Sequence, residues 1–351
     1  MKTIEVNVCP AYSVKIGGGL LTAAGAALHA AAPGAEKAAV VTDDNVELLW
    51  ADRLEAVLRD AGFETARFVL PHGEAQKSPE SYFALLTFLA EEGFSRTDAV
   101  LALGGGTICD FAGFAAATYL RGVPLGMLPT TLLAMADAAV GGKTGIDLPA
   151  GKNLVGAFYQ PAFVLCDTDT LNTLPQQQFS EGCAEILKCA VLGDRALFEQ
   201  LCTVGRGFDR EAVIAACIGL KAACVAADEH DRGQRRLLNL GHTVGHAIEA
   251  KSNYTVSHGI AVAMGLAVIA RAAAAHGICG YDCAEAVTGA LTALGLPAAP
   301  CFCLTELLPF LMQDKKRRAS EIDLIVPETV GRCRVETVPA AQLEAFLKAG
   351  F

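Results

Sequence analysis

Three histidines in the second half of the chain are the residues best suited to chemistry. His242 and His246 are four residues apart, and His258 follows twelve residues after His246. Side chains four residues apart project from the same face of a helix. The chain has only seven histidines, so this grouping indicates a chemical task. Neutral imidazole is a common metal ligand and carries protons near neutral pH.

Two acidic residues and a lysine form a second group. Glu181, Glu185 and Lys188 have the spacing i, i+4, i+7 and would share one face of a helix. The residues between them are apolar and small, which indicates that the charged stripe faces a site; an ordinary solvated face is the alternative. Glu185 and two histidines would give three protein ligands and leave one zinc position open for substrate or water.

The spacing does not settle which two histidines would bind metal. His242 and His246 form an HxxxH pair, which favours them as joint ligands on one helix face. The glutamate that follows the first histidine in the HExxH protease helix is missing here. Core or surface histidines are the alternative, and the cluster with His258 and Glu185 strengthens the metal interpretation.

A glycine-rich turn follows a predicted buried strand. Residues 99–103 are apolar, residues 104–106 are all glycine, and a helix is predicted next. Glycines let a phosphate approach the backbone, and a helix N-terminus offers free N–H groups, so a dinucleotide pyrophosphate would fit. The motif GxGxxG is matched imperfectly, and a tight structural turn is the alternative. Asp43 ends an earlier strand, where it could accept hydrogen bonds from a ribose diol or cap the next helix.

Several cations in this acidic chain indicate a pocket for an anionic ligand. They stand in or beside glycine-rich or motif-like segments, at Arg121, Lys143, Lys152, Lys188, Lys221, Arg235, Lys315 and Lys316. Each alone fits an ordinary surface charge, but together they predict a site for a multiply anionic substrate. Residues 141–144 resemble the end of a Walker A loop, but Asp137 stands where that motif needs glycine, so an ATPase is rejected.

The order of the predicted elements indicates two domains. In the first half, strands at 38–42, 66–70 and 99–103 alternate with helices at 46–61 and 79–92, which predicts a parallel sheet with helices on both faces. Later, Ala-rich helices are predicted at 183–192, 210–228, 242–251, 260–276 and 282–294, before a last strand at 322–326. We therefore expect an α/β Rossmann-like domain, residues 1–175, and a mostly α-helical domain, residues 176–351.

Composition excludes several classes of protein. The chain of 351 residues is 52% hydrophobic and 19% charged, which predicts a large core. A net charge of −10 argues against a nucleic-acid partner. The longest apolar run, 260–270, is too short to span a bilayer, and no signal peptide is recognised. Thirteen cysteines without a CxxC pair are interpreted as buried thiols of a cytoplasmic protein.

Taken in order, these segments resemble the 3-dehydroquinate synthase family of the shikimate pathway, which serves chorismate and aromatic amino-acid biosynthesis. The resemblance covers nearly the full length. Its strings are residues 104–114, 129–134, 140–145, 151–158, the helix with Glu185 and Lys188, and residues 239–249, 257–259 and 314–316. Two departures stand out: Cys109 occupies a position where glycine is common, and Ala138 and Ala139 replace a frequent pair of serines.

The resemblance implies the cofactors and the residues that hold them. The implied metal is zinc, with cobalt as a possible substitute, and its ligands are Glu185, His242 and His258; His246 becomes an acid–base residue that contacts substrate. The implied NAD site comprises Asp43, Asn45, Glu74, Lys77, Gly105, Gly106, Thr107, Asp110, Thr130, Thr131, Asp137, Lys143, Lys152, Thr170 and Thr173. The implied substrate site comprises Lys143, Lys152, Asn153, Lys188, Lys221, Arg235, Asn239 and Lys315 or Lys316. Arg121 matches a position that reaches the neighbouring subunit of a homodimer.

The implied activity is that of an NAD- and metal-dependent phosphorus–oxygen lyase. It converts 3-deoxy-D-arabino-heptulosonate 7-phosphate to 3-dehydroquinate and phosphate by transient oxidation, β-elimination, reduction, ring opening and aldol cyclisation. Three alternatives stay open: a cyclase for a different sugar phosphate, a metal-dependent polyol or alcohol dehydrogenase, and an NAD-binding regulatory module. Asn239, Lys221 and the 315–316 pair favour the shikimate substrate, because its carboxylate needs cationic and amide partners.

Overall fold

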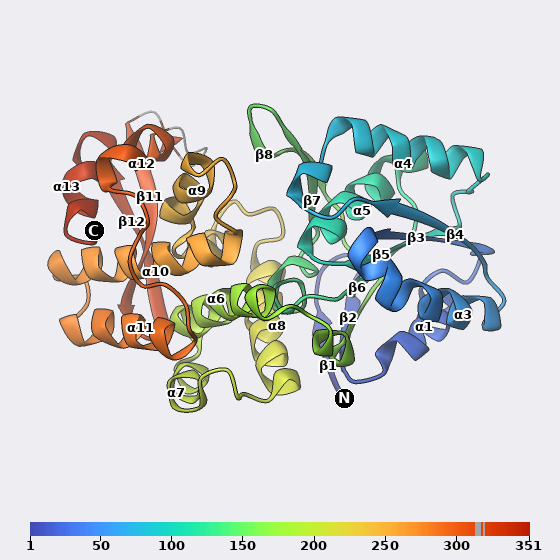
Figure 1. Cartoon of the computed structure of the whole chain (residues 1–351), viewed down its shortest axis with the longest axis horizontal. Coiled ribbons are helices and arrows are strands. Elements are labelled where there is room, and N and C mark those ends of the chain that lie inside the picture. Colours follow the sequence, from blue (N-terminus) through green and yellow to red (C-terminus); the bar gives the residue numbers. More distant parts are fainter. Residues whose placement is uncertain (313–316, 319) are drawn as a thin grey trace. The chain divides into compact units, whose positions relative to one another are not determined.

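The protein is described from a computed structural model that places residues 1–312, 317–318 and 320–351 (Figure 1). The predicted substrate lysines Lys315 and Lys316 lie outside these described residues. The chain forms two compact units. The first comprises Met1–Pro175 and Arg210–His230, and the second comprises Gln176–Asp209 and Asp231–Phe351. Each unit is described by itself below.

A seven-stranded sheet organises the first unit. In spatial order its strands are β1 (Lys2–Val6), β2 (Tyr12–Gly17), β9 (Phe163–Asp167), β6 (Leu125–Pro129), β5 (Ala99–Gly104), β3 (Lys37–Asp43) and β4 (Glu64–Leu70). All neighbours pair in parallel except β1 with β2. The strands β5, β6 and β9 are buried along their whole length, as expected for parallel strands covered on both faces. The parallel sheet predicted from the strand and helix pattern is therefore confirmed.

Helices cover both faces of this sheet (Figure 1). Those before the glycine turn are α1 (Ala24–Ala31), α2 (Asp44–Val46), α3 (Asp52–Asp60) and α4 (Pro79–Glu91), with the short η1 (Leu20–Ala23), η2 (Glu47–Ala51) and η3 (Glu74–Gln76). Those after it are α5 (Gly106–Thr118), η4 (Tyr119–Arg121), η5 (Ala134–Ala138), η6 (Thr168–Asn172) and α8 (Arg210–Ala227). A two-stranded hairpin, β7 (Lys143–Leu148) and β8 (Gly151–Phe158), completes the unit. This hairpin was not predicted from the sequence.

The helix α8 corrects the expected domain division. It carries buried apolar residues that include Val213, Cys217 and Ile218, and it packs on β1, β2 and η5 of the first unit. The sequence-based division assigned everything after residue 175 to one helical domain. That assignment was wrong for α8, because a helical pattern predicts that an apolar face is buried but does not say against which element.

One buried carboxylate fixes the loop that leads into β5. Asp98 accepts hydrogen bonds from the backbone N–H groups of Ser95, Glu36 and Lys37, at 2.7, 3.0 and 2.9 Å. Burial raises the pKa of Asp98, but these hydrogen bonds lower it, and the net shift is downward. Because the folded-state pKa is depressed, the stabilisation is present above the unfolded pKa and is lost as pH falls through the folded value.

Replacement of Asp98 by alanine is therefore expected to lower the free energy of unfolding by about 2–3 kcal/mol at pH 7, because buried donors lose a charged acceptor. The difference from the unchanged protein should shrink as pH falls below about 4. Urea unfolding at several pH values measures both effects. The control is Asp60→Ala, since Asp60 is exposed at the end of α3; a pH-independent difference for Asp98→Ala would contradict the assignment.

The second unit is built around the long helix α10 (His258–Ala275), which packs against α6 (Gln176–Gly193), α9 (His242–Lys251) and α11 (Tyr281–Ala293). Its other elements are α7 (Arg195–Val204), η7 (Gln234–Asn239), α12 (Leu304–Leu311), β10 (Arg317–Arg318), β11 (Glu321–Thr329), β12 (Arg332–Pro339), η8 (Ala340–Gln342) and α13 (Leu343–Lys348). The helices α6, α9, α10 and α11 match predicted helices, and β11 contains the predicted last strand.

Glycines bring three helices of this unit into close contact. A Cβ atom on Gly265 of α10 would overlap the carbonyl oxygen of Gly241, at the start of α9. A Cβ atom on Gly259 would overlap the backbone of Glu181 in α6. Backbones can approach this closely only where no side chain intervenes. The start of α9 is thereby held against the middle of α10, and the start of α10 is held against α6.

Two further sequence-based expectations concern α10 and the cysteines. The helix α10 is long and apolar enough to cross a membrane, but most of it is buried inside the second unit, as in the core helix of a globular domain. All thirteen cysteines are free thiols. The expectation of buried thiols holds for seven of them but is wrong for Cys9, Cys202, Cys301 and Cys303, which are exposed.

Candidate functional site

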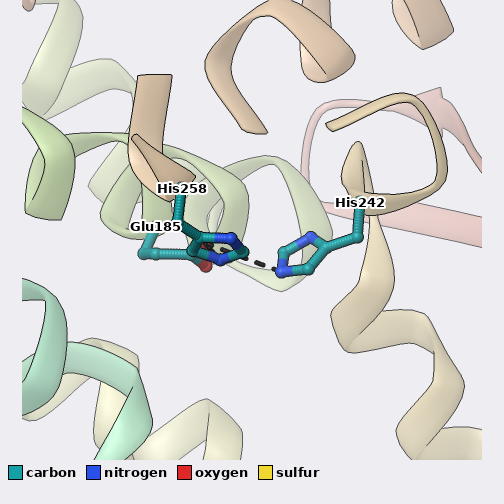
Figure 2. A group of neighbouring side chains, drawn as sticks. All are labelled: Glu185, His242 and His258. Atoms are coloured by element: carbon teal, nitrogen blue, oxygen red, sulfur yellow. Dashed lines mark ion pairs between the residues drawn. The ribbon is translucent and has the colours of Figure 1, made fainter. Parts of the chain in front are cut away.

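Three side chains of the second unit converge on one point (Figure 2). Glu185 comes from the middle of α6, and His242 and His258 are the first residues of α9 and α10. The Nε2 atoms of His242 and His258 lie 3.7 and 3.3 Å from Glu185 Oε1. The possible ligand atoms of the three residues all lie within 4.8 Å of one another.

These distances fit a tetrahedral metal site. Ligand atoms about 2.1 Å from a tetrahedral metal lie roughly 3.4 Å apart, close to both measured separations. Glu185 is 1% exposed, and its Oε1 accepts no hydrogen bond from the described residues. A buried carboxylate oxygen without a hydrogen bond destabilises the folded state unless a cation binds it. Two imidazoles and a carboxylate are also the donors that zinc prefers in catalytic sites.

The second oxygen of Glu185 is engaged by a lysine. Lys188, one turn later on α6 and 1% exposed, places its Nζ 2.5 Å from Glu185 Oε2. Lys188 therefore holds the carboxylate by Oε2, while Oε1 faces the two histidines. The spacing of Glu185 and Lys188 predicted a shared helix face, and the structure shows that this face is buried.

Hydrogen bonds at Nδ1 orient both imidazole rings. His242 Nδ1 lies 3.0 Å from the carbonyl oxygen of Leu240, and His258 Nδ1 lies 3.0 Å from Glu249 Oε2. Both partners can only accept, so both Nδ1 atoms carry the proton. The Nε2 atoms are the ones directed toward Glu185, which is the arrangement that metal-binding histidines adopt.

The two histidines differ in charge when no metal is bound. Burial lowers the pKa of His242 well below its ordinary value, and the nearby Lys188 and other histidines lower it further, so this ring is neutral at pH 7. Burial also lowers the pKa of His258, but the nearby carboxylates of Glu185 and Glu249 outweigh burial and raise the pKa to about 10. A metal ion at Nε2 of His258 would take the place of that proton.

His246 lies beside this group, on the same helix as His242. Its side chain is exposed, and its ring centroid lies 5.4 Å from that of His242 and 6.0 Å from that of His258. Its ligand atoms do not join those of Glu185 and His242, although they group with Glu249 and His258. The helix spacing favoured His242 and His246 as joint ligands, whereas the structure groups His242 with His258.

Glu249 was not singled out by sequence reasoning. It stands seven residues after His242, on the same face of α9, and is 2% exposed. The only signal in the sequence is an acidic residue in the apolar part of a helix, at a spacing that returns to the face of His242.

In the first unit, the residues implied for NAD follow the carboxyl ends of the parallel strands. Asp43 ends β3, the glycine turn follows β5, Thr130 follows β6, and Thr170 and Thr173 follow β9. These strand ends share one edge of the sheet, which is where open α/β sheets bind ligands. Asp43 accepts hydrogen bonds from the backbone of Asn45 and Val46, so it caps α2, one of the two roles considered for it.

The glycine turn itself opens into α5. No side chain caps the N-terminus of this helix, because the residue before its first turn is Gly105. A Cβ atom on Gly105 would lie 3.2 Å from Thr131 Cγ2, so the turn and the residues after β6 are packed closely. Thr130 donates its backbone N–H to Gly104, and its buried Oγ1 has no hydrogen-bond partner among the described residues. A helix N-terminus beside unsatisfied polar atoms fits a bound anion such as a pyrophosphate.

Lys77 is the centre of a buried polar cluster beside this turn. It is 2% exposed, and its Nζ lies 2.9 Å from Asp110 Oδ2 on α5 and 2.6 Å from Asn153 Oδ1 on β8. Glu74 lies within ion-pair distance of Lys77 and Lys152, and it accepts a hydrogen bond from Thr107. Burial raises the pKa of Asp110, although Lys77 opposes this shift. The cluster joins the residues after β4, the start of α5 and the hairpin.

The other predicted site residues of the first unit lie outside the Lys77 cluster. Lys221 of α8 donates to the backbone carbonyl of Asp137 at 2.7 Å and pairs with its carboxylate. Lys143 begins β7 and is exposed. Arg121 is exposed in η4 and has a positive φ of 69°. Thr173 accepts a hydrogen bond from Trp50 Nε1 and donates one to Thr170.

Two predicted substrate residues of the second unit come from η7, the short helix just before α9. Arg235 is 1% exposed, and Asn239 is half-buried and donates to the backbone carbonyl of Arg236. Along the chain, η7 ends at Asn239, three residues before His242 begins α9.

Two family models match the chain in succession. The model described as 3-dehydroquinate synthase N-terminal matches residues 67–181, and the model described as 3-dehydroquinate synthase C-terminal matches residues 182–317. The first match includes the glycine turn and the Lys77 cluster, and the second includes Glu185, His242 and His258.

Curated relatives agree with these models over nearly the whole chain. A 3-dehydroquinate synthase of Caulobacter vibrioides is 42% identical and covers 99% of this chain and 98% of its own. One of Symbiobacterium thermophilum is 41% identical and covers 91% and 92%. One of Pelobacter propionicus is 40% identical and covers 98% of each chain.

Solved structures share the fold. A 2-epi-5-epi-valiolone synthase of Streptomyces hygroscopicus with NAD⁺ and Zn²⁺ bound superposes with a TM-score of 0.86 at 27% identity, over 97% of this chain and 96% of that chain. A 2-deoxy-scyllo-inosose synthase complexed with carbaglucose-6-phosphate, NAD⁺ and Co²⁺ gives 0.88 at 22% identity, over 99% and 100%. A glycerol dehydrogenase of Schizosaccharomyces pombe gives 0.65 at 18% identity, over 96% and 88%.

Proposed function

The chain belongs to the 3-dehydroquinate synthase family. From that premise we propose that the group of Glu185, His242 and His258 binds the catalytic metal, and that the residues at the carboxyl ends of the parallel strands bind NAD. The activity is the conversion of 3-deoxy-D-arabino-heptulosonate 7-phosphate to 3-dehydroquinate and phosphate, so the enzyme is a lyase. The observation that carries the proposal is the convergence of Glu185, His242 and His258 at metal-ligand distances.

We assign the metal to Glu185, His242 and His258, with zinc as the expected ion and cobalt as a substitute. NAD is assigned to the residues at the carboxyl edge of the sheet, from Asp43 to Thr173. When bound, these groups supply a reversible hydride acceptor and a Lewis acid for the substrate's oxygen. Two structural neighbours were solved with NAD⁺ and with zinc or cobalt, which supports both assignments.

The chain's own residues then bind and orient the substrate. The cations at Lys143, Lys152, Lys188, Lys221 and Arg235, with Asn153 and Asn239, are proposed to hold its phosphate and carboxylate. Fixed charges of this kind hold the reacting bonds in one orientation and stabilise the oxyanions that develop. Lys188 would also keep the Glu185 carboxylate in place, through the ion pair at 2.5 Å.

His246 is proposed as the proton carrier of the site. Its ring is exposed and lies within 6.0 Å of the His242 and His258 rings, measured between centroids. A neighbouring imidazole that does not bind the metal can accept a proton from one substrate atom and return it to another near neutral pH.

Several finer assignments belong to the same proposal. One of Lys315 and Lys316 contacts the substrate, Arg121 reaches the site of a neighbouring subunit in a homodimer, and the enzyme works in the cytoplasm. The free thiols support a reducing compartment, and the exposed position of Arg121 is compatible with contact to a second subunit.

The rival activities differ in what they consume. A polyol or alcohol dehydrogenase would release NADH in proportion to product, whereas a cyclase regenerates NAD in every turnover. The dehydrogenase neighbours share only the fold, with identities of 15–18%, while relatives that carry the synthase name reach about 40%. A regulatory module that only binds NAD has no use for a buried metal site.

Incubation with 3-deoxy-D-arabino-heptulosonate 7-phosphate, NAD and zinc tests the proposal. We expect phosphate and 3-dehydroquinate to form in equal amounts, while absorbance at the NADH band stays flat in the steady state. Stoichiometric NADH would favour the dehydrogenase. Turnover of a different sugar phosphate with none of this one would favour the other cyclase.

A further inference from the structure

The buried carboxylate of Glu249 has no role in the assignments made so far. It is 2% exposed, and its Oε2 lies 3.0 Å from Nδ1 of His258. Burying a carboxylate is costly unless its charge is used by a partner. The contact with His258 therefore needs a reason beyond packing.

The two histidines of the metal group are held in different ways. The ring of His242 is oriented by a neutral backbone carbonyl, at Leu240, whereas the ring of His258 is oriented by the charged carboxylate of Glu249. A carboxylate is the stronger acceptor, and it makes the opposite ring nitrogen a better electron donor to a metal. Of the two rings, His258 is thus the one whose metal-binding nitrogen is made more basic.

The position of His258 explains why its ring needs an outside partner. His258 is the first residue of α10, and its side chain is 33% exposed, against 11% for His242. The preceding residue, Ser257, makes no side-chain cap hydrogen bond to the helix. A side chain that is one-third exposed at a helix start is less restrained by packing than a fully buried one, and the hydrogen bond from Nδ1 to Glu249 fixes its rotamer.

We propose that Glu249 is a positioning residue that sets the orientation and donor strength of His258 as a metal ligand. This proposal rests on the metal assignment to Glu185, His242 and His258. Glu249 holds the Nδ1–H of His258, so that Nε2 faces Glu185 Oε1 at 3.3 Å. The negative charge of Glu249 partly balances the charge of the ion that His258 would bind.

A competing arrangement uses Glu249 as a ligand itself. His246, Glu249 and His258 also form a group whose possible ligand atoms lie within 4.8 Å of one another. Glu249 Oε2 is already engaged by the Nδ1–H of His258, however, whereas Glu185 Oε1 accepts no hydrogen bond from the described residues. The open acceptor is therefore on Glu185, and the two arrangements predict different results when Glu249 is changed.

Zinc affinity measured by competition with a chelating dye separates these possibilities. The variants are Glu249→Gln, whose amide oxygen can still accept from Nδ1, and Glu249→Leu, which cannot. Loss of a partner of a metal-bound histidine weakens metal binding by about 10–100-fold. We therefore expect zinc affinity to fall by about 10-fold in Glu249→Gln and by about 100-fold in Glu249→Leu. Both should still bind one zinc ion per chain at saturation.

The control is Glu55→Gln, which changes another buried glutamate that pairs with Arg67 and lies far along the chain in α3. It should leave zinc affinity unchanged. The melting temperature of each metal-free variant shows whether it folds. If Glu249→Leu does not fold, Glu249→Gln still tests the proposal, because glutamine keeps the shape of the side chain.

Each outcome has one meaning. Unchanged affinity in both variants would overturn the positioning role, provided that the unchanged protein binds zinc. Loss of all zinc in Glu249→Gln, as deep as in Glu185→Gln, would overturn it in favour of Glu249 as a ligand. Failure of the unchanged protein to bind zinc would instead refute the metal assignment on which the proposal rests.

Discussion

Replacement of Glu185 by glutamine is expected to lower zinc affinity by well over 100-fold and to abolish turnover. Partners that only orient a ligand contribute about 10–100-fold in affinity, and Glu185 is assigned as a ligand itself. Glutamine keeps the size of the side chain but removes the charge. Its amide is a poor donor to zinc, so His242 and His258 alone would have to hold the ion.

The measurement is zinc content after dialysis, together with turnover at saturating zinc. The matched control is His246→Asn, one helical turn from His242 on α9. That variant should keep full zinc content and lose about 10²–10⁴-fold in turnover, the usual contribution of a general acid or base. If Glu185→Gln kept its zinc, or if His246→Asn lost it, the division between ligands and proton carrier would be wrong.

Replacement of Lys77 by methionine is expected to have the largest effect on stability. Lys77 is 2% exposed and pairs with Asp110 at 2.9 Å. Breaking a buried pair by removing one partner costs about 3–5 kcal/mol, and we expect the lower end here because the side chain of Asp110 is 24% exposed. For a unit of this size, that corresponds to a drop of roughly 10 °C in melting temperature.

The same variant should also weaken NAD binding. Lys77 joins Asp110, at the start of α5, to Asn153 on the hairpin, so its loss would release the residues around the glycine turn. Urea unfolding followed by fluorescence of Trp50, the single tryptophan of the chain, reports on the first unit. NAD binding is measured by calorimetry under conditions where the variant is folded.

The control for Lys77 is an exposed pair in the same unit. Lys37, whose side chain is 27% exposed, lies 3.4 Å from Glu64, whose side chain is 68% exposed, and it also donates to the carbonyl of Glu92. Because exposed pairs contribute about 0–1 kcal/mol, Lys37→Met should change stability little. Equal effects of Lys37→Met and Lys77→Met would show that the Lys77 cluster does not support the unit.

Much of the fold could be predicted from the sequence, because long apolar or amphipathic segments dominate it. The strand at 99–103 and the helices α9 and α10 have strong patterns, and the structure contains them. The hairpin of β7 and β8 was not predicted. It is rich in glycine and lysine, and much of β8 is exposed, so no alternating pattern marks it.

The metal group was recognised only in part from the residues. Residue types singled out Glu185 and the three histidines, but spacing along one helix favoured His246 as the partner of His242, whereas the structure groups His242 with Glu185 and His258. The pairing of His242 with His258 depends on the close approach of α9 to α10 at Gly241 and Gly265, which no local pattern reports. The choice came from the family resemblance, and the proposed role of Glu249 came only from the structure.

The helix α8 has a consequence for how the protein is made. It packs on β1 and β2, which are synthesised first, yet it is separated from them by most of the first unit and by α6 and α7. During translation, the face of β1 and β2 cannot be covered until residues 210–227 have left the ribosome. Contacts between distant segments form slowly, so the nascent chain exposes this apolar face while the next unit is already being made. A gene truncated after residue 175 would leave it uncovered permanently.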